Sequence, residues 1–154
     1  MKPSQLTQLE ALFETSVRPE VVASDALARE LAGLSRAIGR QVGALINRRG
    51  RIEQVVVGDA FKLELPELGR TRASPTRLRG LRLVHTHLRG EPLTPDDLAD
   101  LVVLRLDLVV AIEAKTDGAP GKVYAGHLSP TPAADGRPAW TTLEAPELAV
   151  LELD

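Results

Sequence analysis

The stretch Leu81–Glu113 constrains the fold of this chain more than any other part of its sequence. A short apolar run, Leu81–Val84, is followed by a Gly/Pro loop, an amphipathic segment and a second apolar run, Asp107–Ala114. Apolar, β-branched runs of this length predict buried strands. Thr94, directly before a proline, predicts a helix ending near Arg105, because proline at the first helical position loses no intrahelical hydrogen bond. The stretch therefore predicts a βαβ unit.

Two histidines follow the first of these strands, and an aspartate stands in the first turn of the helix. His85 and His87 are two residues apart, so an extended chain points both imidazoles to one face. Asp97 lies three residues after Thr94, and a capping box with Thr94 accounts for its carboxylate. The same three side chains are also the donor types of a zinc site with one open position, where a metal activates water for hydrolysis. Capping and zinc binding both explain the pattern.

The other apolar patterns add helices and strands to this unit and predict an α/β fold, a mixed β-sheet flanked by helices. Helices are expected over Ser4–Glu14 and Ser24–Ile38, and strands over Gln41–Ile46, Arg51–Val57, Phe61–Leu65, Lys122–Ser129 and from Trp140. Residues 67–80 and 130–138 predict loops, and the apolar tail Leu148–Leu153 predicts a last strand or helix. A single domain 1–154 is expected, with N-terminal helices over 1–38, an α/β core over 40–129 and a C-terminal segment over 130–154.

Composition excludes several classes of protein. The chain has no cysteine, which rules out disulfides and thiolate metal sites and fits a reducing compartment such as the cytoplasm. No run approaches the roughly 18 apolar residues of a membrane-spanning helix, so no membrane partner is expected. Residues 1–90 contain 15 Lys/Arg and 9 Asp/Glu, whereas residues 91–154 contain 4 and 12. This asymmetry predicts a basic surface suited to RNA or to an acidic domain.

An arginine series supplies most of the basic charge. Its members in the loop and the strand after it are Arg70, Arg72, Arg77, Arg79 and Arg82, with Arg89 beyond them and Arg48, Arg49 and Arg51 in the hairpin turn. Guanidinium groups bind phosphates, and no aromatic residue is interleaved, so contact with the RNA backbone is predicted rather than base stacking. A solvated basic surface that pairs with the acidic half of the chain is the alternative.

A phosphate-binding loop is not present in the sequence. The segment Asp117–Lys122 (DGAPGK) lacks the first glycine of G-x-x-x-x-G-K-[ST]. Val123 stands where a serine or threonine would hold magnesium. The segment predicts a turn, and neither GTP nor ATP is expected to bind these 154 residues by that route.

The H-x-H pair followed by Thr94 and Asp97 resembles the signature of JAMM (MPN-type) metalloproteases. That resemblance implies a JAMM/MPN-like, cytidine-deaminase-like arrangement in three layers. The family carries its general base, a glutamate, three residues before a glycine on an earlier strand. Gly43 matches that glycine here and Arg40 takes the position of the glutamate. Because arginine accepts no proton at neutral pH, a non-hydrolytic relative is expected.

Three longer segments resemble, in the same order, the additional N-terminal region of the longer HflX-type GTPases. They are GRQVGALINRRGRIEQVVVGDA (Gly39–Ala60), LPELGR (Leu65–Arg70) and RLRGLRLVHTHLRGEPLTPDDLADLVVLRLDLVVAI (Arg77–Ile112). The resemblance implies a ribosome-associated, stress-linked GTP-binding protein whose nucleotide site lies in a separate G domain. This chain is then expected to be an N-terminal piece or a stand-alone relative, with no GTP-binding residue of its own.

The resemblance implies an accessory domain with no activity and no cofactor of its own. Its partners would be the large ribosomal subunit or ribosomal RNA and the GTPase region of the same parent chain, with RNA contacts at Arg70, Arg72, Arg77, Arg79 and Arg82. Two alternatives stay open: a zinc-dependent hydrolase using His85, His87 and Asp97, and a structural module that docks through its apolar tail.

Overall fold

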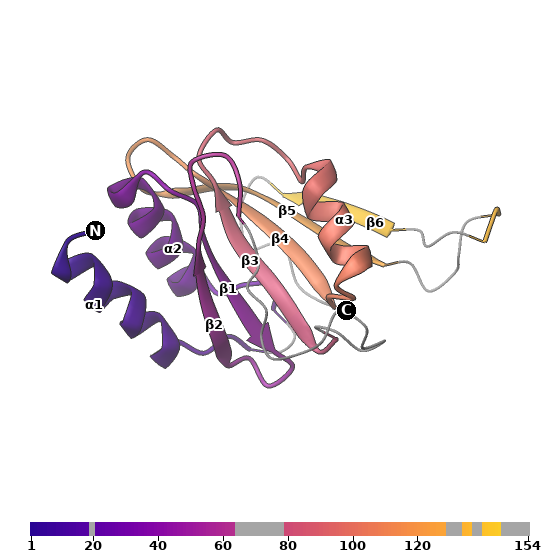
Figure 1. The fold of residues 1–154 in the computed structure, drawn as a ribbon, viewed down its shortest axis with the longest axis horizontal. Coiled ribbons are helices and arrows are strands. Elements are labelled where there is room, and N and C mark those ends of the chain that lie inside the picture. Colours follow the sequence, from indigo (N-terminus) through magenta and orange to yellow (C-terminus); the bar gives the residue numbers. More distant parts are fainter. Residues whose placement is uncertain (19–20, 64–78, 129–133, 137–139, 146–154) are drawn as a thin grey trace.

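The computed structural model describes residues 1–18, 21–63, 79–128, 134–136 and 140–145, which build one mixed sheet with helices on both faces (Figure 1). The strands are β1 (Val42–Asn47), β2 (Ile52–Val57), β3 (Leu81–His87), β4 (Leu108–Ala114), β5 (Pro120–Leu128) and β6 (Trp140–Ala145). The helices are α1 (Pro3–Ala11), the 3₁₀ turn η1 (Leu12–Glu14), α2 (Asp25–Ile38) and α3 (Pro95–Val103).

The sheet has six strands in the order β2-β1-β3-β4-β5-β6. Only β3 and β4 are parallel, and α3 provides the crossover between them, as the predicted βαβ unit requires. Every other neighbouring pair is antiparallel. The α/β class and the mixed sheet are therefore confirmed. The strand pairing also places the end of β1 beside the start of β3, so the sheet has two distinct ends.

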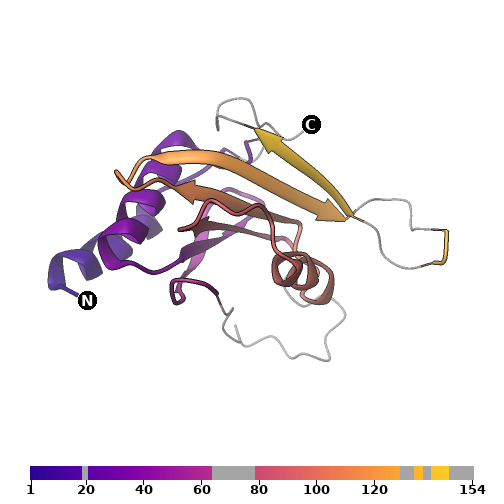
Figure 2. The same ribbon diagram turned by 90° about the horizontal axis from the view of Figure 1, so that it is seen from above.

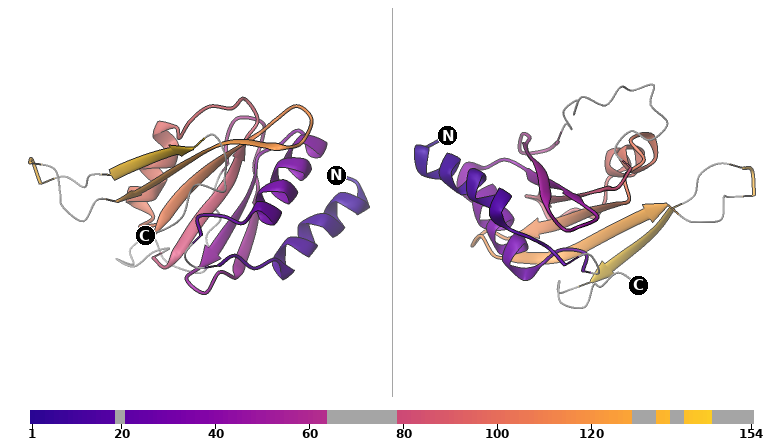
Figure 3. Two further views of the ribbon diagram at one scale, coloured as in Figure 1. Left: turned by 180° about the vertical axis from the view of Figure 1, so that it is seen from behind. Right: turned by 90° about the horizontal axis from the view of Figure 1, so that it is seen from below.

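Two apolar clusters cover the two faces of the sheet. Figures 2 and 3 show the helices that lie over these faces. The larger lies under α2 and includes Leu27, Leu31 and Val84. The smaller lies under α3 and includes Leu83 and Leu101. Because side chains of a strand alternate, β3 contributes to both clusters and is buried along its whole length.

Local signals set the ends of α2. Ser24 accepts a hydrogen bond from the Leu27 N–H at 3.1 Å, and Gly39 ends the helix in the left-handed conformation with φ 67°. The Arg36 side chain leaves this helix and donates to the carbonyl oxygens of Leu88, Ala114 and Lys115. One guanidinium group thus ties α2 to the ends of β3 and β4.

Three sequence predictions need correction. The first helix begins at Pro3, one residue before the predicted start at Ser4, and the α-helix ends at Ala11, where the 3₁₀ turn η1 follows. The third helix ends at Val103, earlier than Arg105. Residues 61–63 form no strand, because the Asp59 carboxylate accepts the N–H groups of Phe61 and Lys62 in a tight turn.

Other predicted segments lie wholly or partly outside the described residues. These are residues 64–78, 129–133 and 137–139, and the tail from 146 onward. In the part of the chain that the structure describes, no helix combines the length and the apolar character needed to cross a bilayer.

Candidate functional site

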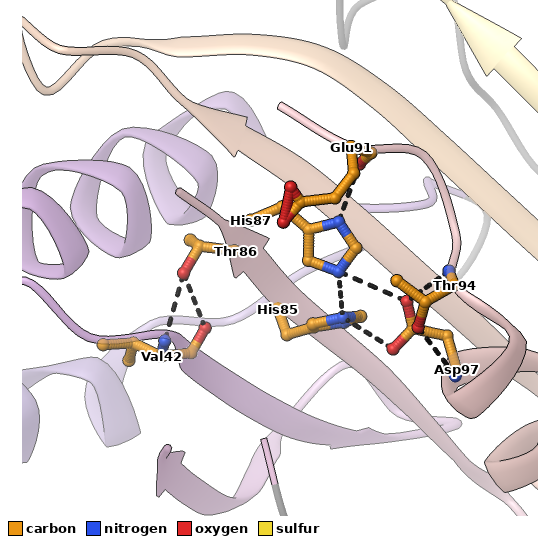
Figure 4. Close-up of polar contacts among 7 residues, drawn as sticks. All are labelled: Val42, His85, Thr86, His87, Glu91, Thr94 and Asp97. Carbon is orange, nitrogen blue, oxygen red and sulfur yellow. Dashed lines mark hydrogen bonds and ion pairs between the residues drawn. The ribbon is translucent and has the colours of Figure 1, made fainter. Parts of the chain in front are cut away.

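The two histidines meet at the end of β3 with their rings in one small space (Figure 4). His85 and His87 are 0% and 2% exposed, and their Nε2 atoms lie 3.0 Å apart. Gly43 on β1 pairs with His85, and a Cβ at Gly43 would come within 3.1 Å of the His85 Cβ. The glycine therefore leaves the room that the imidazole occupies.

Asp97 enters this space from the first turn of α3. Its carboxylate accepts the Thr94 N–H at 2.9 Å, and its own N–H donates to Thr94 Oγ1 at 3.2 Å, which completes the predicted capping box. The same carboxylate places Oδ1 3.1 Å from His85 Nε2 and Oδ2 3.2 Å from His87 Nε2. Capping and clustering with the histidines are thus both present, because one carboxylate has enough lone pairs for both.

The donor atoms of the three side chains lie close enough together to hold one metal ion. Ligands about 2.0–2.1 Å from a zinc ion lie about 3.3 Å from one another. The two Nε2 atoms are 3.0 Å apart and lie 3.1 and 3.2 Å from different oxygens of Asp97. One donor atom from each of the three residues lies within 4.8 Å of the others, so small side-chain movements would bring them to these separations. Within the described chain, His85, His87 and Asp97 are the group of side chains able to hold a metal ion. Two imidazoles and one carboxylate leave the fourth position of a zinc ion open.

A hydrogen bond outside the cluster orients one of the imidazoles. His87 Nδ1 lies 2.7 Å from the carbonyl oxygen of Glu91 and must donate to it, which directs the Nε2 lone pair toward the cluster. Metal-bound histidines commonly have such a partner. His85 Nδ1 is buried and has no hydrogen-bond partner among the described residues. The cluster therefore supports a metal through His87 more strongly than through His85.

The three side chains shift each other's protonation. Burial alone would raise the pKa of Asp97, but hydrogen bonds from His85 and His87 outweigh it and hold that pKa well below its usual range. Burial alone would lower the pKa of His87, but the Asp97 carboxylate and the Glu91 carbonyl outweigh it and raise that pKa. Both shifts favour a protonated His87 beside an ionised Asp97.

A second carboxylate near the cluster was not identified from the sequence. Asp100 stands on α3 three residues after Asp97, which places both on one face of the helix. Burial raises its pKa first of all, followed by the charges of Asp97 and Asp96, whereas the charge of His85 opposes the rise. The helical spacing of the two aspartates is the signal that could have identified it.

The position of the JAMM glutamate carries no proton acceptor. Arg40 is exposed, and its Nε donates to the carbonyl oxygen of Gly58 at 2.6 Å. It therefore supports the turn after β2. The third histidine, His127 on β5, stands apart from the cluster, and its Nδ1 donates to the Leu128 carbonyl at 3.1 Å.

The predicted RNA contacts have different outcomes. Arg82 is only 6% exposed, and its guanidinium donates to the carbonyl oxygens of Val21 and Arg18. Arg82 is buried because it lies on the face of β3 that α2 covers. The prediction that it contributes to an exposed phosphate-binding surface is therefore wrong. Arg79 is exposed at the start of β3. The remaining three, Arg70, Arg72 and Arg77, lie outside the described residues.

Comparisons with known proteins assign no family. No protein-family model matches the chain, and no curated protein matches it either.

Proposed function

We propose that this chain is an accessory N-terminal domain of an HflX-like GTP-binding protein, acting in ribosome or RNA contact or in regulation in the cytoplasm. Its partners would be the large ribosomal subunit and the GTPase region of the same parent chain. The observation that supports the proposal is the placement of the resembling segments. Gly39–Ala60 supplies β1 and β2, and Arg77–Ile112 supplies β3, α3 and most of β4. These four strands are neighbours in one sheet, in the order β2-β1-β3-β4.

The arrangement suits a contact domain because its basic residues stand in connections between strands. Arg48, Arg49 and Arg51 lie at the β1–β2 turn, and all three are exposed. Loops carried on a rigid sheet commonly hold binding residues. Arginine is also the side chain best matched to phosphate geometry.

Sedimentation of the 154-residue chain with purified large ribosomal subunits tests this function. We expect cosedimentation at about 50 mM salt that weakens by at least tenfold at about 200 mM, because each neutralised phosphate releases counterions. Bovine serum albumin, a protein of net negative charge, serves as the control. Absence of cosedimentation at the lower salt concentration would refute the proposal.

A zinc-dependent hydrolase of the JAMM type is the second candidate, and the convergence of His85, His87 and Asp97 favours it. These three residues would hold the ion, and a bound zinc ion lowers the pKa of its water ligand. Asp100, whose pKa is raised by burial, is the carboxylate on the same helix face that could accept a proton, since Arg40 cannot.

Metal analysis of the purified chain separates the two candidates. We expect a zinc-binding chain to hold one equivalent, and His85→Ala to abolish it. His127→Ala is the matched control, because it removes the same side chain from a position outside the cluster. A folded wild-type chain that takes up no added zinc would end the hydrolase candidate and leave the accessory domain unaffected.

A further inference from the structure

Arginines gather at the end of the sheet opposite the histidine cluster. The register pairs Asn47 with Leu81 and Arg82 with Leu108, so the β1–β2 turn, the entry to β3 and the entry to β4 lie together. Figure 1 shows this end at the bottom and the β3–α3 loop at the top. The three connections contain Arg48, Arg49, Arg51, Arg79 and Arg105 and a single acidic residue, Asp107. We call these residues the basic end.

Asp107 is already engaged within the basic end. Arg48 donates to both of its carboxylate oxygens, from Nε at 2.8 Å and from the second guanidinium nitrogen at 3.0 Å. The Gly80 N–H donates to the same carboxylate at 3.1 Å. This bidentate pair joins the three connections and fixes their relative positions. The single acidic charge is therefore paired with Arg48, and Arg79 also interacts with it electrostatically.

Three guanidinium groups of the basic end are exposed and unpaired within the described part of the chain. Arg49 and Arg51 flank the buried Gly50 in the turn, and Arg105 follows α3. None has a hydrogen bond or ion pair from its side chain to another described residue. Like charges on one surface repel, so an anion that approached from outside would stabilise this end of the sheet.

The backbone at Arg105 gives a second, independent observation. Arg105 has φ 55°, a left-handed conformation that side chains with a Cβ rarely adopt. Every other residue with positive φ in the described chain is a glycine, including Gly39 at the end of α2. In the described chain, glycine thus occupies every position where the backbone turns this way except Arg105. A strained non-glycine residue is a sign of a functional constraint on its side chain.

We propose that Arg49, Arg51 and Arg105 form a binding surface for the phosphate backbone of RNA. This inference rests on the proposed ribosomal function and replaces the buried Arg82 as a contact. Guanidinium groups match phosphate oxygens with paired donors, and three of them spread over one end of a sheet suit a chain of phosphates better than a single anion. None of the three connections contains an aromatic residue, so the surface recognises the backbone and is insensitive to base sequence.

Charge reversal tests the surface. The variant Arg49→Glu/Arg51→Glu/Arg105→Glu is compared with Lys2→Glu/Arg89→Glu/Lys115→Glu, which makes the same change in net charge at exposed positions outside the basic end. The probes are purified large ribosomal subunits and protein-free large-subunit ribosomal RNA. For the first variant, we expect at least tenfold weaker binding to both probes. The slope of log affinity against log salt concentration should also fall in magnitude by about one for each lost phosphate contact. The control variant should stay within about threefold of wild type by the same salt relation.

The outcomes distinguish this inference from the function on which it rests. A wild-type chain that binds neither probe refutes the proposed function and this surface with it. Wild-type binding that both triple variants weaken equally, or that neither weakens, overturns the surface and leaves the function standing. Binding to subunits but not to free RNA identifies a ribosomal protein as the partner and also overturns the RNA surface.

Arg105→Gly provides a test that cannot be explained by unfolding. Glycine relieves the left-handed backbone, so its melting temperature should equal or exceed that of wild type. Its affinity for the ribosomal RNA should nevertheless fall severalfold, because one phosphate contact is lost. Unchanged affinity in this variant would overturn the role of Arg105.

Discussion

The smallest feature on which the site depends is the missing side chain of Gly43. A Cβ there would lie 3.1 Å from both the His85 Cβ and a Leu63 methyl carbon, and 3.3 Å from a Leu83 methyl carbon. The buried strands around this position leave little freedom to relax.

We expect Gly43→Ala to lower the free energy of unfolding by about 1–3 kcal/mol through overpacking. Gly33→Ala is the control, because the new Cβ on α2 would have no atom closer than 3.9 Å. That substitution should raise stability by about 0.5–1 kcal/mol through helix propensity. Urea unfolding measures both values, and equal effects at the two sites would contradict the packing argument.

Residue-level chemistry was predictable from sequence where local geometry decides it. The alternation of a strand places His85 and His87 on one face, and the Thr94–Asp97 spacing gives the capping box. The burial of Arg82 was not predictable, because it depends on Val21 from a distant segment. The strained backbone of Arg105 was equally hidden, since no residue-type rule predicts an arginine there.

At the scale of elements, the first turn of α3 has two roles. It contains the capping box of the helix, and it supplies the site residue Asp97. Thr94 Oγ1 accepts a hydrogen bond from the Asp97 N–H, and the Thr94 N–H donates to the Asp97 carboxylate. The cap therefore orients the side chain that faces the histidines. Loss of the cap should disturb the helix and the site together.

We expect Thr94→Ala to lower the free energy of unfolding by about 1 kcal/mol, the usual cost of a lost cap. If the histidine cluster binds zinc, the affinity should fall as well, because the Asp97 carboxylate is less restrained. Thr94→Ser keeps the hydroxyl and should retain both properties. Calorimetric titration with zinc and urea unfolding are the measurements. If Thr94→Ala matches Thr94→Ser in both, the cap does not position Asp97.

The order of helices and strands was largely predictable, because periodicity and turn residues are local signals. The hairpin of β1 and β2, the βαβ unit, β5 and β6 all appear near their expected bounds. The strand expected from the alternation of Phe61 and Leu63 fails, since the Asp59 side chain captures the backbone there. The antiparallel pairing of β1 with β3 had no signal in the sequence and follows from long-range packing.

At the scale of the whole molecule, the histidine cluster makes stability depend on pH. The raised pKa of His87 contributes stability below its unfolded value of 6.5, and this contribution is lost as pH rises through the folded value. The lowered pKa of Asp97 contributes stability above its unfolded value of 3.8, and this contribution is lost as pH falls. The two contributions overlap in mildly acidic solution.

We therefore expect the chain without zinc to be most stable between about pH 4 and pH 6.5 and to lose stability toward about pH 8. Added zinc should reverse this trend above about pH 7, because metal binding needs neutral imidazoles. Urea unfolding across this range, with and without zinc, gives the two profiles. His87→Gln should flatten the alkaline decline, and a decline of equal slope in that variant would contradict the assignment.

Helix α3 lies between the two candidate binding sites of the molecule. Its first turn contains Asp97, and the chain leaves its last turn toward Arg105. A helix about 13 Å long therefore connects the histidine cluster with the basic end. A ligand that moved α3 at one end would also move the residues at its other end. Thermodynamic reciprocity then requires each occupant to change the affinity of the other by the same factor. If a metal ion and an RNA strand both bind, α3 would couple the two binding sites.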